Sequence, residues 1–279
     1  MNIKDSGHFY FTENRVKKMK EMKQENQKPV TFVGAGPGDP DLITIKGRRA
    51  LLEADLVIYA GSLVPEALLI HVKTEARKVN SASMHLDEII SEMEKAYWNN
   101  EFVVRLHTGD PSLYGAIFEQ ITELDKRSIP FKIIPGVTAA FGAVASMGIE
   151  YTLPEVSQTL ILTRMEGRTP VPEKEELASL ASHQASMAIY LSMSLIHDVA
   201  GILGKAYGKK SICAVVYRAT QPEEKIIYTE IEKLEQRVKQ EKIKNQALII
   251  AGKVLNISQK ELKHKSKLYD EHFSHGHRQ

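Results

Sequence analysis

The sequence has a single cysteine, Cys213, which excludes an internal disulfide framework and a cysteine-rich zinc site. No apolar run approaches the roughly 18–20 residues that a membrane-spanning helix needs, and residues 1–20 lack the apolar core of a signal peptide. The 37 Lys and Arg nearly balance the 35 Asp and Glu, and a net charge of +2 excludes a bulk electrostatic binder of nucleic acid. We therefore expect a cytoplasmic protein with neither nucleic acid nor a membrane as its partner.

The composition is typical of a folded protein, because 43% of the residues are hydrophobic and 26% are charged. A length of 279 residues suits one large domain or two of ordinary size. The segments 1–29 and 257–279 are polar, and the second contains four of the ten histidines, which are His264, His272, His275 and His277. Metal binding by this tail is one interpretation. We favour a solvated tail and expect no metal site.

Short runs rich in β-branched residues alternate with amphipathic segments in the first half of the chain. The predicted strands are 30–34, 56–59, 102–106 and 131–134. Apolar residues at helical spacing predict helices over 86–97 and 114–124. Strands separated by helices indicate βαβ units and a mainly parallel sheet.

The same alternation restarts after Pro154. Strands are predicted at 159–163, 187–191, 212–217 and 247–252, with a helix over 195–203. The extended segment 224–230 follows a strand closely and indicates a hairpin, so this half is expected to have a mixed sheet. We predict an α/β protein with two α/β domains, 30–148 and 149–256, between the polar N-terminal extension 1–29 and the His-rich tail 257–279.

The first motif, GAGPGDP over 34–40, lies between a predicted strand and a predicted helix, where a dinucleotide-binding fingerprint would lie. It does not match that fingerprint, because Asp39 stands where the third glycine is required. Pro37 also removes a backbone N–H that a phosphate loop would use. Three glycines and two prolines in seven residues nevertheless indicate a specific backbone path that passes close to another group. We interpret the motif as a functional loop that does not bind a nucleotide diphosphate.

Two further motifs follow predicted strands. In LHTGDPSLYG over 106–115, Asp110 is expected to cap the next helix with Pro111 at its first position. His107 and Asp110 are also weaker candidates for a catalytic role. In PGVTAA over 135–140, small residues leave room for a flat group and Thr138 offers a hydroxyl. The alternative for this third motif is a tight turn into a close-packed helix.

The three motif loops follow the first, third and fourth predicted strands, so they are expected at one edge of a parallel sheet, where such sheets bind ligands. They contain no Walker lysine, no metal-ligand cluster and no serine–histidine–acid arrangement. These absences exclude the common phosphoryl-transfer and hydrolase templates.

The motifs VGAGPGDPDLITIKGRRAL, TGDPSLYG and PGVTAA, in this order and spacing, resemble the tetrapyrrole methylases. The resemblance covers roughly residues 30–255 and implies an S-adenosylmethionine-dependent methyltransferase with two α/β domains and the active site in a cleft between them. Other segments resemble the subgroup that methylates C-11 of precorrin-4 or cobalt-precorrin-4 during cobalamin biosynthesis. They lie at 57–69, 81–90, 105–120, 153–177 and 214–226. The resemblance also implies a homodimer.

The resemblance implies that S-adenosylmethionine is bound by residues of the three motifs and of the second domain, and that S-adenosylhomocysteine is the product. Carried over by motif, the cofactor contacts are Pro37, Thr108, Gly109, Asp110, Leu113, Thr138, Ala139, Leu191 and Ala219. Leu191, which we interpret as a strand residue, stands where relatives often carry Met. Ala219 stands where some relatives carry Gly.

The implied reaction needs little covalent catalysis by the protein, because the thioether is a good leaving group and the electron-rich tetrapyrrole supplies the attacking electron pair. We therefore expect no indispensable catalytic side chain, and alignment to be the enzyme's main task. The substrate carries several carboxylates, which arginine binds bidentately. The candidate substrate residues are Arg105, Arg164, Arg168 and Arg218, with Ser81, Ser83, Met84 and His85 as a further loop. Arg164 and Arg168 are the preferred pair, and Ser83 has a helix cap as its alternative.

Three other functions compete with this hypothesis. One is another methylase of the same fold, such as a uroporphyrinogen-III, diphthine or RNA methylase. A second is a nicotinamide-dependent oxidoreductase, which the failed fingerprint disfavours. The third is a binding module without enzymatic activity, which leaves three cofactor-type loops at strand ends unexplained. Whether the substrate already contains cobalt is left open by the sequence, and we favour the cobalt form.

Overall fold

The computed structural model describes residues 27–61, 64–257, 266, 273–274 and 276. The four histidines of the C-terminal tail, and any metal site that they would form, lie outside the described residues. Among the described residues, no helix is both long and apolar enough to cross a membrane. These residues form two compact units, one from the residues up to 35 with 40–136, and one from 36–39 with the residues from 137 onward. The domain boundaries at 148 and 149 stay a prediction.

The first unit contains a parallel five-stranded sheet in the order β3-β2-β4-β1-β5. Its strands are β1 (Val30–Gly34), β2 (Leu56–Tyr59), β3 (Arg77–Asn80), β4 (Val103–His107) and β5 (Phe131–Ile134). The parallel sheet confirms the prediction from the alternating runs. The sequence missed β3, because its residues Arg-Lys-Val-Asn are mostly polar. Such a composition is typical of an exposed edge strand.

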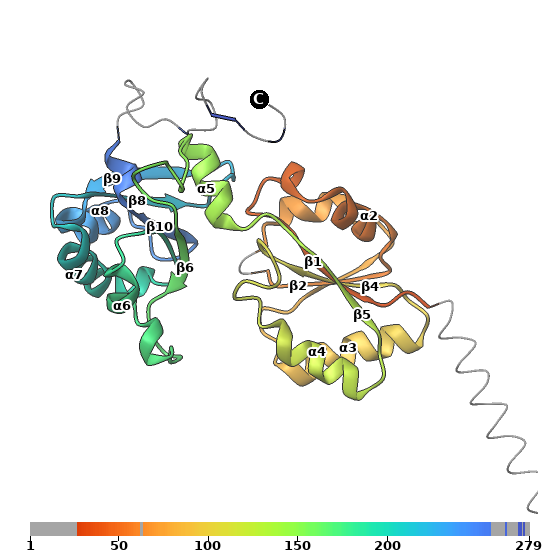
Figure 1. Cartoon of the computed structure of the whole chain (residues 1–279). Helices are drawn as coiled ribbons and strands as arrows, with labels where there is room; N and C mark the ends of the chain where they lie inside the picture. Colours follow the sequence, from red (N-terminus) through yellow and green to blue (C-terminus); the bar gives the residue numbers. More distant parts are fainter. Residues whose placement is uncertain (1–26, 62–63, 258–265, 267–272, 275, 277–279) are drawn as a thin grey trace, which may run out of the picture. The chain divides into compact units, whose positions relative to one another are not determined.

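Helices cover both faces of this sheet, α2 (Ile45–Glu53) on one face and α3 (Leu86–Trp98) with α4 (Ile117–Lys126) on the other (Figure 1). Leu51 of α2 packs with Val33 and Val104, while Met93 of α3 packs with Phe32 and Ile58. Alternate residues of one strand therefore enter opposite cores, as a sheet buried on both faces requires.

The second unit contains a mixed sheet in the order β6-β7-β10-β8-β9, which confirms the predicted hairpin and mixed sheet. Its strands are β6 (Leu160–Arg164), β7 (Ser186–Tyr190), β8 (Ile212–Tyr217), β9 (Lys225–Glu230) and β10 (Ala247–Ala251). Only the β6–β7 pair is parallel, and β10 and β9 run antiparallel to their neighbours.

The helices of the second unit are α5 (Ala139–Met147), α6 (Leu177–Ala181), α7 (Ile196–Tyr207) and α8 (Leu234–Gln240). Helices α6, α7 and α8 pack on one face of the sheet, and α5 packs on the other (Figure 1). The short 3-10 helices of the two units are Pro40–Leu42, Glu66–His71, Glu173–Glu175, Met193–Leu195, Ile231–Lys233 and Lys253–Asn256.

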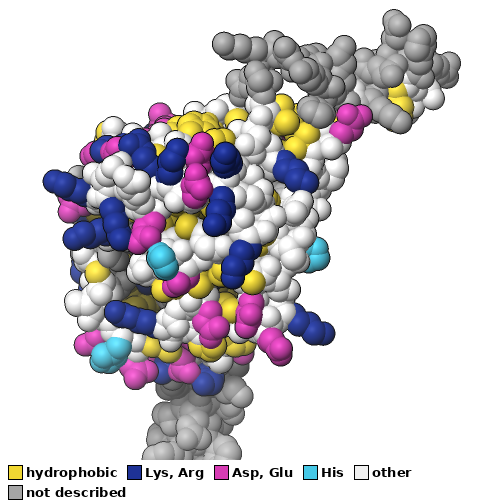
Figure 2. All heavy atoms as spheres, turned by 90° about the vertical axis from the view of Figure 1, so that its left-hand side faces the viewer, with side chains coloured by type: hydrophobic (Ala, Val, Ile, Leu, Met, Phe, Trp, Pro, Cys, Tyr) yellow, Lys and Arg dark blue, Asp and Glu magenta, His cyan; other side chains and the backbone are white. Residues whose placement is uncertain are grey.

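Surface charges of opposite sign are interspersed on the face of the protein that Figure 2 shows. On α7 and α8, for example, Glu235 pairs with both His197 and Lys239. This mixing agrees with the near-zero net charge. On this face, it does not form the positive stripe that is typical of nucleic-acid binding.

Candidate functional site

Three glycines, one from each motif, pack against one another at the carboxyl ends of β1, β4 and β5. A Cβ atom added at Gly136 would lie 2.1 Å from the Gly109 carbonyl oxygen, and one added at Gly34 would lie 2.5 Å from the Gly136 nitrogen. The three strands are neighbours in the sheet, so the prediction that their loops share one edge is confirmed. Only glycine permits this approach of three backbones.

The carboxylate of Asp110 ties two of these loops together. Its Oδ2 accepts a hydrogen bond from the Gly136 N–H at 2.9 Å, and its Oδ1 accepts from the Ser112 N–H at 2.8 Å and from the Ser112 hydroxyl. The expected helix cap is wrong, because α4 begins at Ile117 after Ala116 and residues 111–114 form a turn. Burial raises the pKa of Asp110, but the hydrogen bonds from Ser112 and Gly136 outweigh it and lower the pKa.

The rest of the second motif follows a strained path. Tyr114 has a φ of 55° and Ala116 a φ of 47°, both in the left-handed region that residues with a Cβ seldom adopt. Thr108 and Leu113 are half-buried and Gly109 is buried. Strained backbone of this kind concentrates at binding sites, where the surrounding structure maintains it.

His107 lies at the end of β4 and is buried, with its ring stacked 5.9 Å from that of Phe32. Its Nε2 atom is buried without a hydrogen-bond partner among the described residues. Burial, together with the charge of Arg105, lowers the pKa of His107 to about 3. A general base works best with a pKa near the operating pH, so these properties count against His107 as a catalytic base.

The first motif contributes Pro37 to the second unit. The Asp39 N–H donates to the Thr220 hydroxyl at 3.0 Å, and the Gln221 amide donates to the Pro37 carbonyl at 3.4 Å. A Cβ added at Gly142 of α5 would lie 2.8 Å from the Pro37 ring. Residues 36–39 therefore pack on α5 and on the loop after β8, which brings Pro37 close to the loop that holds the buried Ala219.

Thr138 and Leu191 are brought together by a tyrosine that the sequence reasoning missed. The Tyr190 hydroxyl lies 2.7 Å from the Thr138 hydroxyl and accepts a hydrogen bond from the Ala140 N–H at 2.9 Å, at the start of α5. Leu191 follows it in the left-handed region with a φ of 53°, and its side chain is 63% exposed. The prediction that Leu191 is a strand residue is wrong, since β7 ends at Tyr190. Ala139 is half-buried at the start of the same helix.

Removing the Tyr190 hydroxyl with Tyr190→Phe is expected to lower the free energy of unfolding by about 1–3 kcal/mol, because a buried N–H of α5 loses its acceptor. Tyr228→Phe provides the matched control, since Tyr228 is 48% exposed on β9. Urea denaturation of both variants measures the difference. Equal stabilities would show that the hydroxyl of Tyr190 does not hold α5.

The predicted substrate arginines of the second unit have different surroundings. Arg164 donates to the backbone carbonyls of Thr169 at 3.1 Å and Pro170 at 2.7 Å, and so fixes the loop that follows β6. Arg168 lies in that loop and is exposed. Arg218 donates to Gln246 at 2.8 Å and pairs with Glu223 at 3.4 Å. Of the three, Arg168 has the most freedom to meet an anion, and all three substrate roles stay predictions.

In the first unit, the structure joins two more of the predicted substrate residues. Arg105 donates from Nη1 to the Ser81 hydroxyl at 3.0 Å and from Nε to Gln120 Oε1 at 3.1 Å. Ser81 and Arg105 are buried, whereas Met84 is half-buried against the core beside α3. The alternative of a Ser83 cap is wrong, because α3 begins at Leu86 after His85, whose N–H donates to Glu88 at 3.0 Å.

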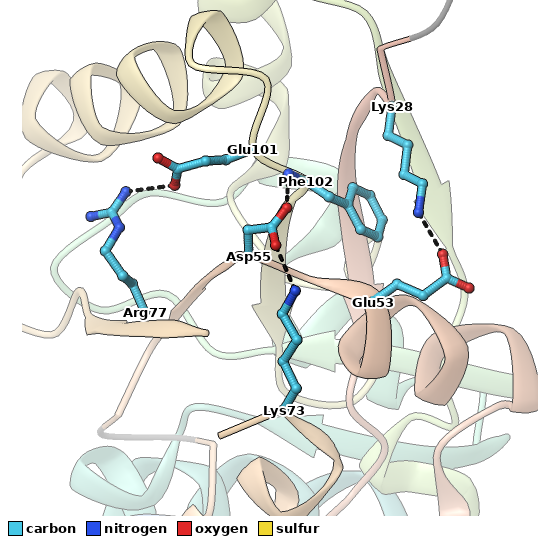
Figure 3. Close-up of polar contacts among 7 residues, drawn as sticks. All are labelled: Lys28, Glu53, Asp55, Lys73, Arg77, Glu101 and Phe102. Atoms are coloured by element: carbon cyan, nitrogen blue, oxygen red, sulfur yellow. Dashed lines mark hydrogen bonds and ion pairs between the residues drawn. The ribbon is translucent and has the colours of Figure 1, made fainter. Parts of the chain in front are cut away.

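The opposite edge of the same sheet is held by paired charges (Figure 3). Asp55 accepts from Lys73 at 2.5 Å and from the Phe102 N–H at 2.8 Å, and both hydrogen bonds lower its pKa. Arg77 donates to Glu101 at 3.0 Å, and Lys28 pairs with Glu53 at 2.6 Å. The charged side chains at the amino-terminal ends of the strands are therefore paired with one another and stabilise the fold. The loops at the carboxyl ends are instead rich in glycine.

Comparison with known proteins gives four consistent results. A model of the family "Tetrapyrrole (Corrin/Porphyrin) Methylases" matches residues 29–235. A cobalt-precorrin-4 C(11)-methyltransferase from Methanocaldococcus jannaschii is 53% identical over 255 residues, which cover 91% of this chain and 97% of that protein. A precorrin-4 C(11)-methyltransferase from Pseudomonas aeruginosa is 44% identical over 226 residues, 81% of this chain and 90% of that protein. The X-ray structure of a cobalt precorrin-4 methyltransferase, a cobalamin biosynthetic enzyme, is 44% identical with a TM-score of 0.78 and covers 81% of this chain and 95% of that one.

Proposed function

The chain belongs to the tetrapyrrole methylases, and from this premise we propose that it transfers a methyl group from S-adenosylmethionine to C-11 of cobalt-precorrin-4. The observation that carries the proposal is the 53% identity to a cobalt-precorrin-4 C(11)-methyltransferase across 97% of that protein's length. Precorrin-4 without cobalt is the second candidate, because a relative with that name is 44% identical. We also propose that the enzyme acts in the cytoplasm, and that it is a homodimer as the family resemblance implies.

The candidate residues are suited to S-adenosylmethionine rather than to a dinucleotide. Pro37 removes an N–H that a pyrophosphate would need, and the carboxylate of Asp110 adds negative charge at the loop that follows β4. The side chains of Ala139, Leu191 and Ala219 are apolar, which suits a neutral adenosine group. We assign the cofactor to Pro37, Thr108, Gly109, Asp110, Leu113, Thr138, Ala139, Leu191 and Ala219.

The contribution of this chain to the reaction is orientation. When bound by the residues named above, S-adenosylmethionine would supply an electrophilic methyl group to the ring carbon and leave as S-adenosylhomocysteine. The packed glycines and the hydrogen bonds of Asp110 fix the loops of the first unit, and Tyr190 fixes Thr138 in the second. Holding reactants in line is worth roughly 7–11 kcal/mol of the barrier, so alignment is the contribution that we propose for these residues.

The test is incubation of the purified protein with methyl-labelled S-adenosylmethionine and precorrin-4, with and without cobalt. We expect one label per product molecule, located on C-11, and faster transfer to the cobalt form. A label on C-2 or C-7 would indicate another methylase of the same family. Faster transfer to the metal-free substrate would make precorrin-4 the substrate.

Calorimetry with S-adenosylhomocysteine and with NAD separates the proposal from the other enzyme class. We expect binding of S-adenosylhomocysteine and none of NAD. Binding of NAD alone would favour the oxidoreductase. Tight binding of S-adenosylhomocysteine without methylation of any precorrin would favour a binding module.

A further inference from the structure

The guanidinium of Arg105 is a buried cation whose charge the described part of the chain does not neutralise. Its side chain is 5% exposed, and burial lowers its pKa to about 10, so it stays protonated at neutral pH. Its partners, Ser81 and Gln120, are both neutral. No carboxylate among the described residues lies within 4.0 Å of its nitrogens. Arg77, at the opposite edge, has Glu92 and Glu101 beside it.

One nitrogen of this guanidinium has no hydrogen-bond partner among the described residues. Nε and Nη1 are occupied by Gln120 and Ser81, whereas Nη2 has no hydrogen-bond partner among the described residues. The only described side-chain atoms that are both fully buried and unpartnered are Tyr97 Oη and His107 Nε2. Nη2 is therefore not fully buried, while the hydrogen bonds of Nε and Nη1 fix the orientation of the guanidinium.

A continuous set of hydrogen bonds holds Arg105 among the candidate loops. Ser81 donates to the Tyr59 carbonyl at 3.1 Å, and the Gln120 amide donates to the carbonyl of Ala116, the residue after the second motif, at 3.0 Å. Arg105 is thus connected to the loop after β3 and to the strained loop before α4. A charge fixed in this way loses little entropy when it binds an anion.

We propose that Arg105 binds one carboxylate of the tetrapyrrole through Nη2, and that the neutral side chain of Gln120 keeps the positive charge available for it. The proposal rests on the proposed function, which supplies a polycarboxylate substrate. A buried charge without a partner is costly, so a carboxylate that meets it gains more than it would at an exposed arginine. A glutamate at position 120 would form an ion pair with Arg105 and so neutralise the guanidinium within the protein.

The test is Gln120→Glu, with Gln120→Met as the matched control. Both variants lose the hydrogen bond to the Ala116 carbonyl, and methionine also loses the one from Arg105 Nε, but only glutamate neutralises Arg105. Binding of uroporphyrin III, a porphyrin octacarboxylate, is measured by fluorescence quenching, and the KM and kcat for cobalt-precorrin-4 are measured alongside. We expect Gln120→Glu to weaken porphyrin binding and raise the KM at least tenfold, with the affinity for S-adenosylhomocysteine unchanged, and Gln120→Met to weaken porphyrin binding several times less than Gln120→Glu does.

The outcomes separate this inference from the proposed function. Weaker porphyrin binding by Gln120→Glu alone supports the carboxylate site even if cobalt-precorrin-4 is not methylated, a result that would overturn only the proposed function. Equal porphyrin affinity of wild type and Gln120→Glu overturns the inference, as does a wild type that does not bind the porphyrin. An equal loss in Gln120→Met and Gln120→Glu also overturns it, because the effect would then come from the lost hydrogen bonds of Gln120 and not from the charge.

Discussion

Gly136→Ala is expected to destabilise the first unit by about 3 kcal/mol or more, at or above the upper end of the usual cost of overpacking. The new Cβ would lie 2.1 Å from the Gly109 carbonyl oxygen and 2.8 Å from Gly34 backbone atoms. These are backbone atoms of neighbouring strand ends, so no rotamer change relieves the contact. Methyl transfer should fall about 100-fold in the fraction that folds, because a displacement of about 1 Å has that cost.

Gly201→Ala is the matched control for this substitution. Gly201 lies within α7, and a Cβ added there meets nothing within 4 Å. Alanine should raise the free energy of unfolding by about 0.5–1 kcal/mol, because glycine is unfavourable inside a helix. Urea denaturation of both variants gives the comparison. A Gly136→Ala protein as stable as the wild type would show that the three loops do not pack as described.

The shared edge of the three motif loops could be predicted from the sequence because it depends on local patterns. Each loop follows a β-branched run, and parallel strands place their carboxyl ends together. The positions of the glycines follow from the same pattern, because Gly34, Gly109 and Gly136 each lie at a strand end or just beyond one. The mixed sheet of the second unit followed from the short connection between the strands now seen as β8 and β9.

The partners of the site residues could not be predicted, because they lie far away in the sequence. Asp39 bonds Thr220 and Thr138 bonds Tyr190, and no periodicity links such positions. The pattern Ile-Tyr-Leu at the end of a buried strand was the one available signal for Tyr190, a polar group at a position expected to be apolar. Asp110 was wrongly predicted to cap a helix for the same reason. A carboxylate that can cap a helix can equally accept a hydrogen bond from another loop, and the sequence does not distinguish the two.

Asp110→Asn is expected to lower the free energy of unfolding by about 1.5–3 kcal/mol, the usual range for hydrogen bonds to a charged group. In asparagine an NH2 group replaces one carboxylate oxygen. This donor then faces another donor, the N–H of either Gly136 or Ser112. Methyl transfer should fall about 100-fold, because the loop after β4 loses its tie to the loop after β5. Asp125→Asn is the control, since Asp125 is exposed and its side chain bonds no described residue.

The pH dependence of stability distinguishes loss of this carboxylate from general damage to the loop. The pKa of Asp110 is lowered in the folded protein, so its stabilisation is complete above the unfolded value of about 3.9 and is lost as the pH falls through the folded value. Asparagine does not titrate. The difference in unfolding free energy between wild type and Asp110→Asn should therefore be constant from pH 7 to about pH 5 and shrink below about pH 4. A difference that stays constant down to pH 3 would mean that packing, and not the ionised carboxylate, holds the two loops together.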